Sequence, residues 1–217
     1  RSTLPNQTMA RIADMNVIVT NKVAINASAL ASSSLQLIIV AATGTNNIDL
    51  EEAERKAISV CNVRDYASPA VSQHVFSMIL ALYTRLSDYA NAVREGRWHQ
   101  SPVFCLLDYP INELAGKTLG IIGYGNLGKR VARIAQGFEM NVIIAARPGT
   151  TTIPPGRVSF DELIDTSDVI SLHCPLNDDT NNLIDHRALK RMKSGALLIN
   201  TARGGIVNES ALVEALL

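Results

Sequence analysis

The chain has 217 residues, of which 47% are hydrophobic and 18% charged, and its 20 basic side chains are balanced by 20 acidic ones. A net charge of zero removes the broad electrostatic attraction that binding to nucleic acid or to an anionic membrane requires. The sequence has no apolar stretch long enough to span a bilayer and no secretion signal at its start. The composition therefore favours a cytoplasmic protein that binds a small molecule, with no nucleic-acid or membrane partner.

Cys61, Cys105 and Cys174 are odd in number, widely separated and without a C-x-x-C pair. This pattern predicts reduced thiols, and neither a disulfide framework nor a metal site. The chain opens on Arg1 and stops inside an apolar-periodic run at 211–216 that has no Gly or Pro stop signal. These ends indicate a fragment of a longer protein.

Three short apolar runs, at 17–19, 37–40 and 58–60, predict strands in the first part of the chain. Between the second and third, Asp49 is an N-cap candidate for a helix with acidic residues in its first turn and basic residues at its end. The succession of strand, helix and strand predicts an α/β unit with parallel strands over 1–68.

Ser68 and Pro69 form the N-cap and N1 pair typical of a helix start. Apolar residues then follow at helical spacing until Gly96, which predicts one long helix over about 69–95, roughly seven turns long. Such a helix suits the bridging of two domains or contact with a second subunit. A simple core helix is an equally compatible interpretation.

Residues 118–128 read as an apolar strand that runs into three glycines at the G-x-G-x-x-G spacing and then into a helix. Gly123 would allow the tight turn, Gly125 would let a pyrophosphate approach the backbone, and Gly128 would let the helix pack on the strand. The amide groups and positive dipole end of that helix would face the anion. The pattern predicts a dinucleotide-binding turn.

The rest of the chain alternates between strand and helix patterns. Ser159 begins a capping box with Glu162, Asp185 is a further N-cap candidate, and Gly195 is expected to close the helix before the last strand. This alternation predicts a doubly wound domain over 69–217, which lacks at least the last of the usual six strands. Its expected strands are 118–122, 141–146, 168–172 and 196–200, and its expected helices are 126–137, 159–165, 185–193 and 208–217.

Five motifs in order carry a more specific signal: 41–50, 68–74, 118–128, 171–176 and 199–207. Together they resemble the D-isomer-specific 2-hydroxyacid dehydrogenases, over essentially the whole chain. Residues 20–23, 43–47 and 104–108 are most similar to the branch of glycerate dehydrogenase, also called hydroxypyruvate reductase.

The resemblance implies two Rossmann-like parallel-sheet domains, a flavodoxin-like substrate domain and an NAD(P)-binding domain, both truncated in this chain, with an active-site cleft between them. It implies hydride transfer between NAD(P)H and a small 2-keto or 2-hydroxy acid (hydroxypyruvate and D-glycerate, or glyoxylate and glycolate) in a homodimer. It assigns the substrate to Thr43, Gly44, Thr45 and Arg203. The residues that it assigns to the cofactor are Gly123, Tyr124, Gly125, Asn126, Leu127, Gly128, Ala146, Arg147, Cys174, Pro175, Thr180, Thr201, Ala202 and Arg203.

The family uses an Arg, a Glu and a His in catalysis, and only the Arg falls within this chain, at Arg203. The chemistry of Arg203 supports this assignment independently of the resemblance. Arg203 follows an apolar strand, and a guanidinium at that position could hold a substrate carboxylate and polarise the adjacent carbonyl. The Glu and His would lie beyond Leu217, so this polypeptide alone is expected to be inactive. Of the histidines present, His74 could line the cleft but is rather expected to be packed or capped. His173 is expected to serve the nucleotide side, and His99 and His186 to be on the surface.

The cofactor pattern departs from the family at one position. Ala146 stands where the acidic residue that binds the ribose hydroxyls is expected, and Arg147 follows it. Arg147 could pair with a 2′-phosphate, which predicts tolerance of, or preference for, NADPH.

A second departure from the family is Glu139, where a left-handed backbone would carry modest strain.

Two alternatives remain open at this stage. A dinucleotide-sensing protein similar to the corepressors that share this fold would keep the nucleotide site without the reaction. A phosphoglycerate dehydrogenase would need an additional positive group for the substrate phosphate and often a regulatory domain, and neither is visible in the sequence.

Overall fold

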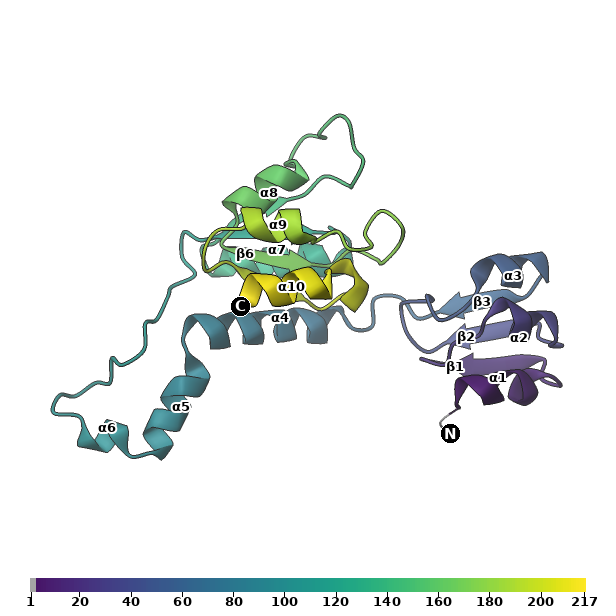
Figure 1. Ribbon diagram of the computed structural model, residues 1–217, viewed down its shortest axis with the longest axis horizontal. Coiled ribbons are helices and arrows are strands. Elements are labelled where there is room, and N and C mark those ends of the chain that lie inside the picture. Colours follow the sequence, from purple (N-terminus) through teal and green to yellow (C-terminus); the bar gives the residue numbers. More distant parts are fainter. Residues whose placement is uncertain (1–2) are drawn as a thin grey trace. The chain divides into compact units, whose positions relative to one another are not determined.

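The structure is a computed structural model that describes residues 3–217, and the chain divides into two compact units, Arg1–Tyr66 and Ala67–Leu217 (Figure 1). Both units contain a parallel sheet, as predicted. No helix of residues 3–217 is long and apolar enough to cross a membrane.

The first unit has a three-stranded parallel sheet in the order β1-β2-β3, formed by Val17–Thr20, Leu37–Val40 and Ser59–Asn62. Its helices are α1 (Pro5–Ile12), α2 (Ala27–Ala31) and α3 (Leu50–Arg55), and the Asp49 side chain caps α3 by accepting from the Glu52 amide. The sequence pattern predicted α3 and the three strands, but not α1 or α2.

The three helices share one core with one face of this sheet, where Leu30, Ile38 and Val40 are fully buried. The opposite face is open, because Val17 and Val19 are 51% and 69% exposed. Parallel sheets in α/β proteins are generally covered on both faces, so this face is unusual for an isolated unit.

The predicted long helix is wrong as a single element, because it is two helices: α4 (Ser68–Tyr83) and α5 (Leu86–Arg94). Arg85 has a left-handed backbone, with φ 52°, and the amide of Asn112 donates to the carbonyl of Tyr83 just before the break. The predicted N-cap is also displaced, because Ala67 occupies that position and Ser68 is already helical.

The second unit contains a four-stranded parallel sheet in the order β5-β4-β6-β7, formed by Thr118–Ile122 (β4), Asn141–Ile144 (β5), Val169–Leu172 (β6) and Leu197–Asn200 (β7). Its further helices are α7 (Asn126–Gly137), α8 (Phe160–Thr166), α9 (His186–Arg191), a 3-10 turn at Gly204–Ile206 and α10 (Glu209–Leu216). The order confirms the doubly wound prediction, since the chain moves to one side of β4 for β5 and to the other side for β6.

Side-chain caps begin α8 and α9 where the sequence predicted them. Ser159 and Asp185 accept from the amides of Glu162 and Ala188 at the starts of α8 and α9. Gly195 does not close α9, which ends at Arg191; it has φ 79° and lies in the turn that leads to β7. Glu139 has φ 57°, so the expected left-handed backbone at that position is confirmed.

Helices cover both faces of the second sheet. On one face, α4 and α7 pack on β4 through side chains that include Val75, Ile79, Leu119 and Val131. On the other face, α8, α9 and α10 enclose a second core that includes Leu163, Ile170 and Ile184. This burial on both faces explains the continuous apolar runs of β4 and β6.

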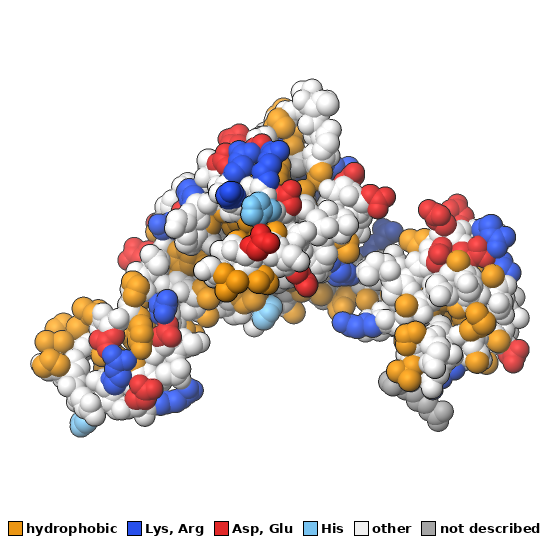
Figure 2. Space-filling model, viewed as in Figure 1, with side chains coloured by type: hydrophobic (Ala, Val, Ile, Leu, Met, Phe, Trp, Pro, Cys, Tyr) orange, Lys and Arg blue, Asp and Glu red, His pale blue; other side chains and the backbone are white. Residues whose placement is uncertain are grey.

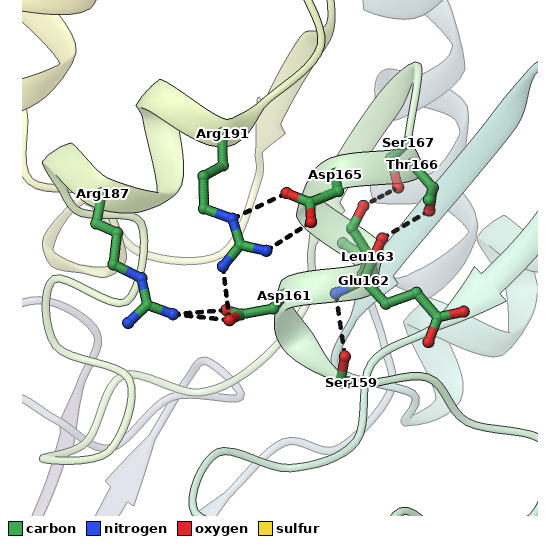
Figure 3. A network of polar contacts seen from close by, with 9 residues as sticks. All are labelled: Ser159, Asp161, Glu162, Leu163, Asp165, Thr166, Ser167, Arg187 and Arg191. Carbon is green, nitrogen blue, oxygen red and sulfur yellow. Dashed lines mark hydrogen bonds and ion pairs between the residues drawn. The ribbon is translucent and has the colours of Figure 1, made fainter.

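An ion-pair network on the surface joins α8 to α9 (Figure 3). The Arg191 guanidinium lies 2.6 Å from an Asp161 oxygen and 2.5 Å from an Asp165 oxygen, and Arg187 lies 2.8 Å from Asp161. The hydrogen bond from Arg191 lowers the pKa of Asp161 below its ordinary value. The network ties two helices together on the same face of the sheet.

The segment 86–111, which we call the apolar segment, contains α5, α6 (Arg97–Gln100) and the loop that follows. It is ordered internally, because Arg97 pairs with Asp108 and donates to the hydroxyl of Tyr109. It is also rich in exposed apolar side chains, visible as orange atoms around α6 in Figure 2. Those at least half exposed are Leu86, Val93, Trp98, Val103, Phe104, Leu107 and Ile111.

Candidate functional site

The glycine turn after β4 has the geometry that a dinucleotide pyrophosphate requires. Gly123 has φ 94°, and a Cβ there would lie 2.4 Å from the Cys174 amide nitrogen. A Cβ on Gly128 would lie 2.2 Å from the carbonyl oxygen of Gly123, so α7 packs directly against the turn. A Cβ on Gly125 would meet nothing within 4 Å.

These three glycines therefore serve different purposes. Gly123 and Gly128 lack side chains because the protein itself fills the space, whereas Gly125 faces open space at the start of α7. That space lies in front of the first amides and the positive dipole end of a 12-residue helix. It is the place where a pyrophosphate fits without a steric obstacle.

The other predicted cofactor residues of this unit follow the carboxyl ends of neighbouring strands. The register pairs Leu172 of β6 with Asn200 of β7, so the segments that begin at His173 and Thr201 leave the sheet side by side. The segment after β5 contains Ala146 and Arg147. In open α/β sheets the carboxyl edge is where ligands bind, and the glycine turn lies at the point where the strand order reverses.

Two buried polar atoms at this edge have no partner among the described residues: Nδ1 of His173 and Oγ1 of Thr201. His173 also contacts the Ser171 hydroxyl through Nε2, at 2.9 Å, and burial lowers its pKa to about 4, so its ring is neutral at physiological pH. Buried polar atoms are usually hydrogen-bonded. Both atoms therefore fit a bound polar ligand such as a nicotinamide nucleotide.

Cys174 and Thr180 have mainly internal contacts. Burial raises the pKa of the Cys174 thiol, and the Thr180 hydroxyl donates to the carbonyl of Pro175 at 2.6 Å. Thr180 thus closes the loop after β6, and its side chain is 4% exposed. Pro175 is exposed, so this part of the loop, more than the Thr180 hydroxyl, is accessible to a ligand.

Arg203 lies on the exposed turn after β7. The turn is fixed by Asn200, whose side-chain amide donates to the Arg203 carbonyl and whose side-chain oxygen accepts from the Ala202 amide. The guanidinium of Arg203 donates to the Ala202 carbonyl at 2.8 Å. The planar guanidinium fork matches the geometry of a carboxylate.

In the first unit, the predicted substrate residues follow β2. Thr43 donates through its hydroxyl to the carbonyl of Val63, and its own carbonyl accepts from the side-chain amide of Asn62. The amide of Ile48 donates to the carbonyl of Thr45. The loop is therefore a fixed turn at the carboxyl edge of its sheet. Thr20, at the end of β1, has a buried hydroxyl without a partner among residues 3–217, and the sequence pattern did not mark it as a site residue.

The remaining histidines are away from these groups. His74 on α4 is exposed, so the expectation that it is packed or capped is wrong, while His99 and His186 are on the surface as predicted. No group of three or more His, Cys, Asp or Glu side chains within residues 3–217 could hold a metal ion. The three cysteines are free thiols.

Comparison with known proteins gives a consistent result. Residues 76–217 match the family described as D-isomer specific 2-hydroxyacid dehydrogenase, NAD binding domain. Over 214 residues the chain is 44% identical to a glycerate dehydrogenase of Methylorubrum extorquens, and the match covers 98% of this chain and 67% of that protein. It is 34% identical over 214 residues to a hydroxypyruvate reductase of Blautia hydrogenotrophica, covering 97% of this chain and 66% of that protein.

Among solved structures, an acyclic imino acid reductase in complex with NADPH and D-Arg superposes with a TM-score of 0.86 at 31% identity. That match covers 99% of this chain and 68% of the solved chain, so the sequence spans about two thirds of the length of its relatives. The glycine turn, the doubly wound sheet and these similarities agree with the motifs. The chain belongs to the D-isomer-specific 2-hydroxyacid dehydrogenase family, NAD(P)-linked oxidoreductases that act on small 2-hydroxy acids.

Proposed function

We propose that the intact protein reduces hydroxypyruvate or glyoxylate, and oxidises the matching 2-hydroxy acid, with a preference for NADPH. The proposed preference for NADPH rests on Ala146, which follows β5 at the position where an acidic residue would select NADH. A carboxylate there would repel a 2′-phosphate, whereas Arg147 beside it attracts one. The names of the glycerate dehydrogenase and hydroxypyruvate reductase relatives support the substrate class.

In this proposal the glycine turn (Gly123–Gly128) binds the pyrophosphate, and the segments of Cys174–Pro175 and Thr201–Ala202 bind the nicotinamide half. The bound nicotinamide supplies the hydride. Arg203 holds the substrate carboxylate and stabilises the negative charge that develops on the carbonyl oxygen. The amides of Thr43–Thr45 are further ligands for the carboxylate.

The test measures kcat/KM of the intact protein for hydroxypyruvate, glyoxylate and 3-phosphohydroxypyruvate, each with NADPH and with NADH. We expect turnover of the first two and a preference for NADPH. Arg203→Gln should lower kcat/KM about 10²- to 10³-fold, the size typical of losing a group that stabilises an oxyanion. Arg133→Gln, at an exposed position on α7, is the matched control and should change little.

Three results would contradict the proposal. Strong preference for NADH would reject the role of Ala146 and Arg147, and preference for the phosphorylated substrate would favour a phosphoglycerate dehydrogenase. Tight binding of the nucleotide without turnover of any 2-keto acid would favour the corepressor-like alternative.

We also propose a homodimer in which the apolar segment (86–111) contacts a second copy. Phe104 and Leu107 are 95% and 79% exposed, and monomeric proteins rarely expose contiguous apolar patches of this kind. A self-complementary patch is what a two-fold dimer requires. Light scattering should show a dimer that Phe104→Ser with Leu107→Ser dissociates and that Ile153→Ser, at a loop position 42% exposed, leaves intact. A monomeric wild type would refute this assembly.

The proposed location is the cytoplasm, because three free thiols fit a reducing compartment.

A further inference from the structure

A short stretch beyond β5 returns to the carboxyl end of that strand. The amide of Val158 donates to the carbonyl of Ile144 at 2.9 Å, and the amide of Ala146 donates to the carbonyl of Val158 at 2.8 Å. Ala145 and Val158 form a parallel bridge. Because of these bonds, the backbone of Arg157 is held next to the end of β5, although it lies ten residues beyond Arg147 in the sequence.

The side chain of Arg157 is fixed as well. Its guanidinium carbon lies 4.9 Å from the centroid of the Tyr124 ring, and Nη1 lies 3.4 Å from the Ala145 carbonyl oxygen. Tyr124 in turn packs against the core beneath β4 and α7. Arg157 is half-buried, whereas Arg147 is exposed. Stacking on an aromatic face holds a planar guanidinium in one orientation and leaves its edge N–H groups for hydrogen bonds.

The two contacts of Arg157 belong to the two sides of an adenosine ribose site. Tyr124 lies between the first two glycines of the pyrophosphate turn, and Ala145 directly precedes the position that selects between NAD and NADP. A ribose 2′-substituent in this fold is recognised beside that position. Arg157 is therefore placed at the point where a 2′-phosphate would be bound.

We infer that Arg157 is a specificity-determining residue that binds the 2′-phosphate of NADPH together with Arg147, and that Tyr124 is the platform that positions it. The inference rests on the proposed use of NADPH. A phosphate dianion is best neutralised by two cations, and a guanidinium that is already ordered loses less side-chain entropy on binding than an exposed one. Arg157 is the ordered ligand of the pair, and Arg147 is the exposed one.

The test uses adenosine 2′,5′-bisphosphate and adenosine 5′-monophosphate as probes, with dissociation constants measured by calorimetry on the intact protein. The wild type should bind the bisphosphate more tightly. Arg157→Gln should reduce this preference about ten- to hundredfold, the size expected for a hydrogen bond to a charged group. Arg157→Lys keeps the positive charge but lacks the planar guanidinium fork, so it should retain only part of the preference for the bisphosphate. Arg133→Gln removes the same charge from α7 and should leave the preference unchanged.

The outcomes separate this inference from the proposed function. A wild type that binds both probes equally would refute both NADPH preference and the role of Arg157. A wild-type preference that persists in Arg157→Gln would refute the role of Arg157 alone and leave Arg147 as the phosphate ligand. Equal weakening of both probes in Arg157→Gln would show that Arg157 only packs on Tyr124 or the adenine, which also overturns the inference. If Arg157→Gln fails to fold, the same three comparisons apply to Arg157→Lys.

Discussion

The glycines of the nucleotide turn provide a direct test of the site. Alanine at one of them should lower stability, and alanine at another should lower nucleotide affinity. Gly123→Ala places a Cβ on a residue with φ 94° and 2.4 Å from a backbone nitrogen that cannot move aside. The left-handed backbone costs about 1–2 kcal/mol for an L-residue, and forced overpacking adds about 1–3 kcal/mol. The expected loss in the free energy of unfolding is therefore about 2–5 kcal/mol, out of a typical total of about 5–15 kcal/mol.

Gly125→Ala should behave in the opposite way. Gly125 has φ −78° and ψ −162°, which alanine adopts readily, and the added Cβ meets no protein atom within 4 Å. The reduced entropy of the unfolded chain offsets the poorer N-cap, so stability should change by less than about 1 kcal/mol. The new methyl group would, however, occupy the space proposed for the pyrophosphate. Nucleotide affinity should therefore fall while the protein remains folded.

Urea unfolding followed by circular dichroism measures the first effect, and calorimetric titration with NADPH measures the second. If Gly125→Ala bound the nucleotide as tightly as the wild type, the open space at Gly125 would not be the pyrophosphate site. A Gly123→Ala protein with unchanged stability would show that the Cys174 backbone can move away.

Three further predictions concern stability and pH. Glu139→Gly should raise the free energy of unfolding by up to about 1 kcal/mol in urea melts, because φ is 57° and glycine adopts this backbone without strain; a loss of stability would mean that the flexibility of the unfolded glycine dominates. Because burial lowers the pKa of His173 to about 4, below its unfolded value near 6.5, the unfolded chain binds a proton first as pH falls through this interval, and native stability should decrease there. His173→Gln should flatten that part of the stability profile, and an NMR titration of the ring near pH 6.5 would contradict the buried neutral state. Asp161→Asn should lower the melting temperature at neutral pH and have little effect near pH 2–3, since a carboxylate with a lowered pKa stabilises the fold above its unfolded pKa and loses this effect as pH falls; a difference that persisted in acid would mean that packing, and not charge, is responsible.

The sequence alone determined most of the local elements of the second unit from residue 118 onward, and the chemistry of its glycine turn. Strand β4 and helix α7 have the predicted bounds, since the apolar run, the glycine spacing and the amphipathic pattern are local signals. The side-chain caps at Asp49, Ser159 and Asp185 could also be predicted, because a cap is a contact between residues three positions apart.

Other features depend on contacts between residues far apart in the chain. Apolar spacing continues from α4 into α5 without interruption, so the pattern could not reveal the break at Arg85, where Asn112 returns to bond the Tyr83 carbonyl. Periodicity reports which residues face a core, but it does not report which backbone groups a distant segment will bind. Tertiary structure alone decided the break, the burial of the His173 ring and the stacking of Arg157 on Tyr124 across 33 positions. Each of these features depends on contacts between residues far apart in the chain. The local sequence around the residues does not predict these contacts, because the interacting groups come together only when the sheet assembles.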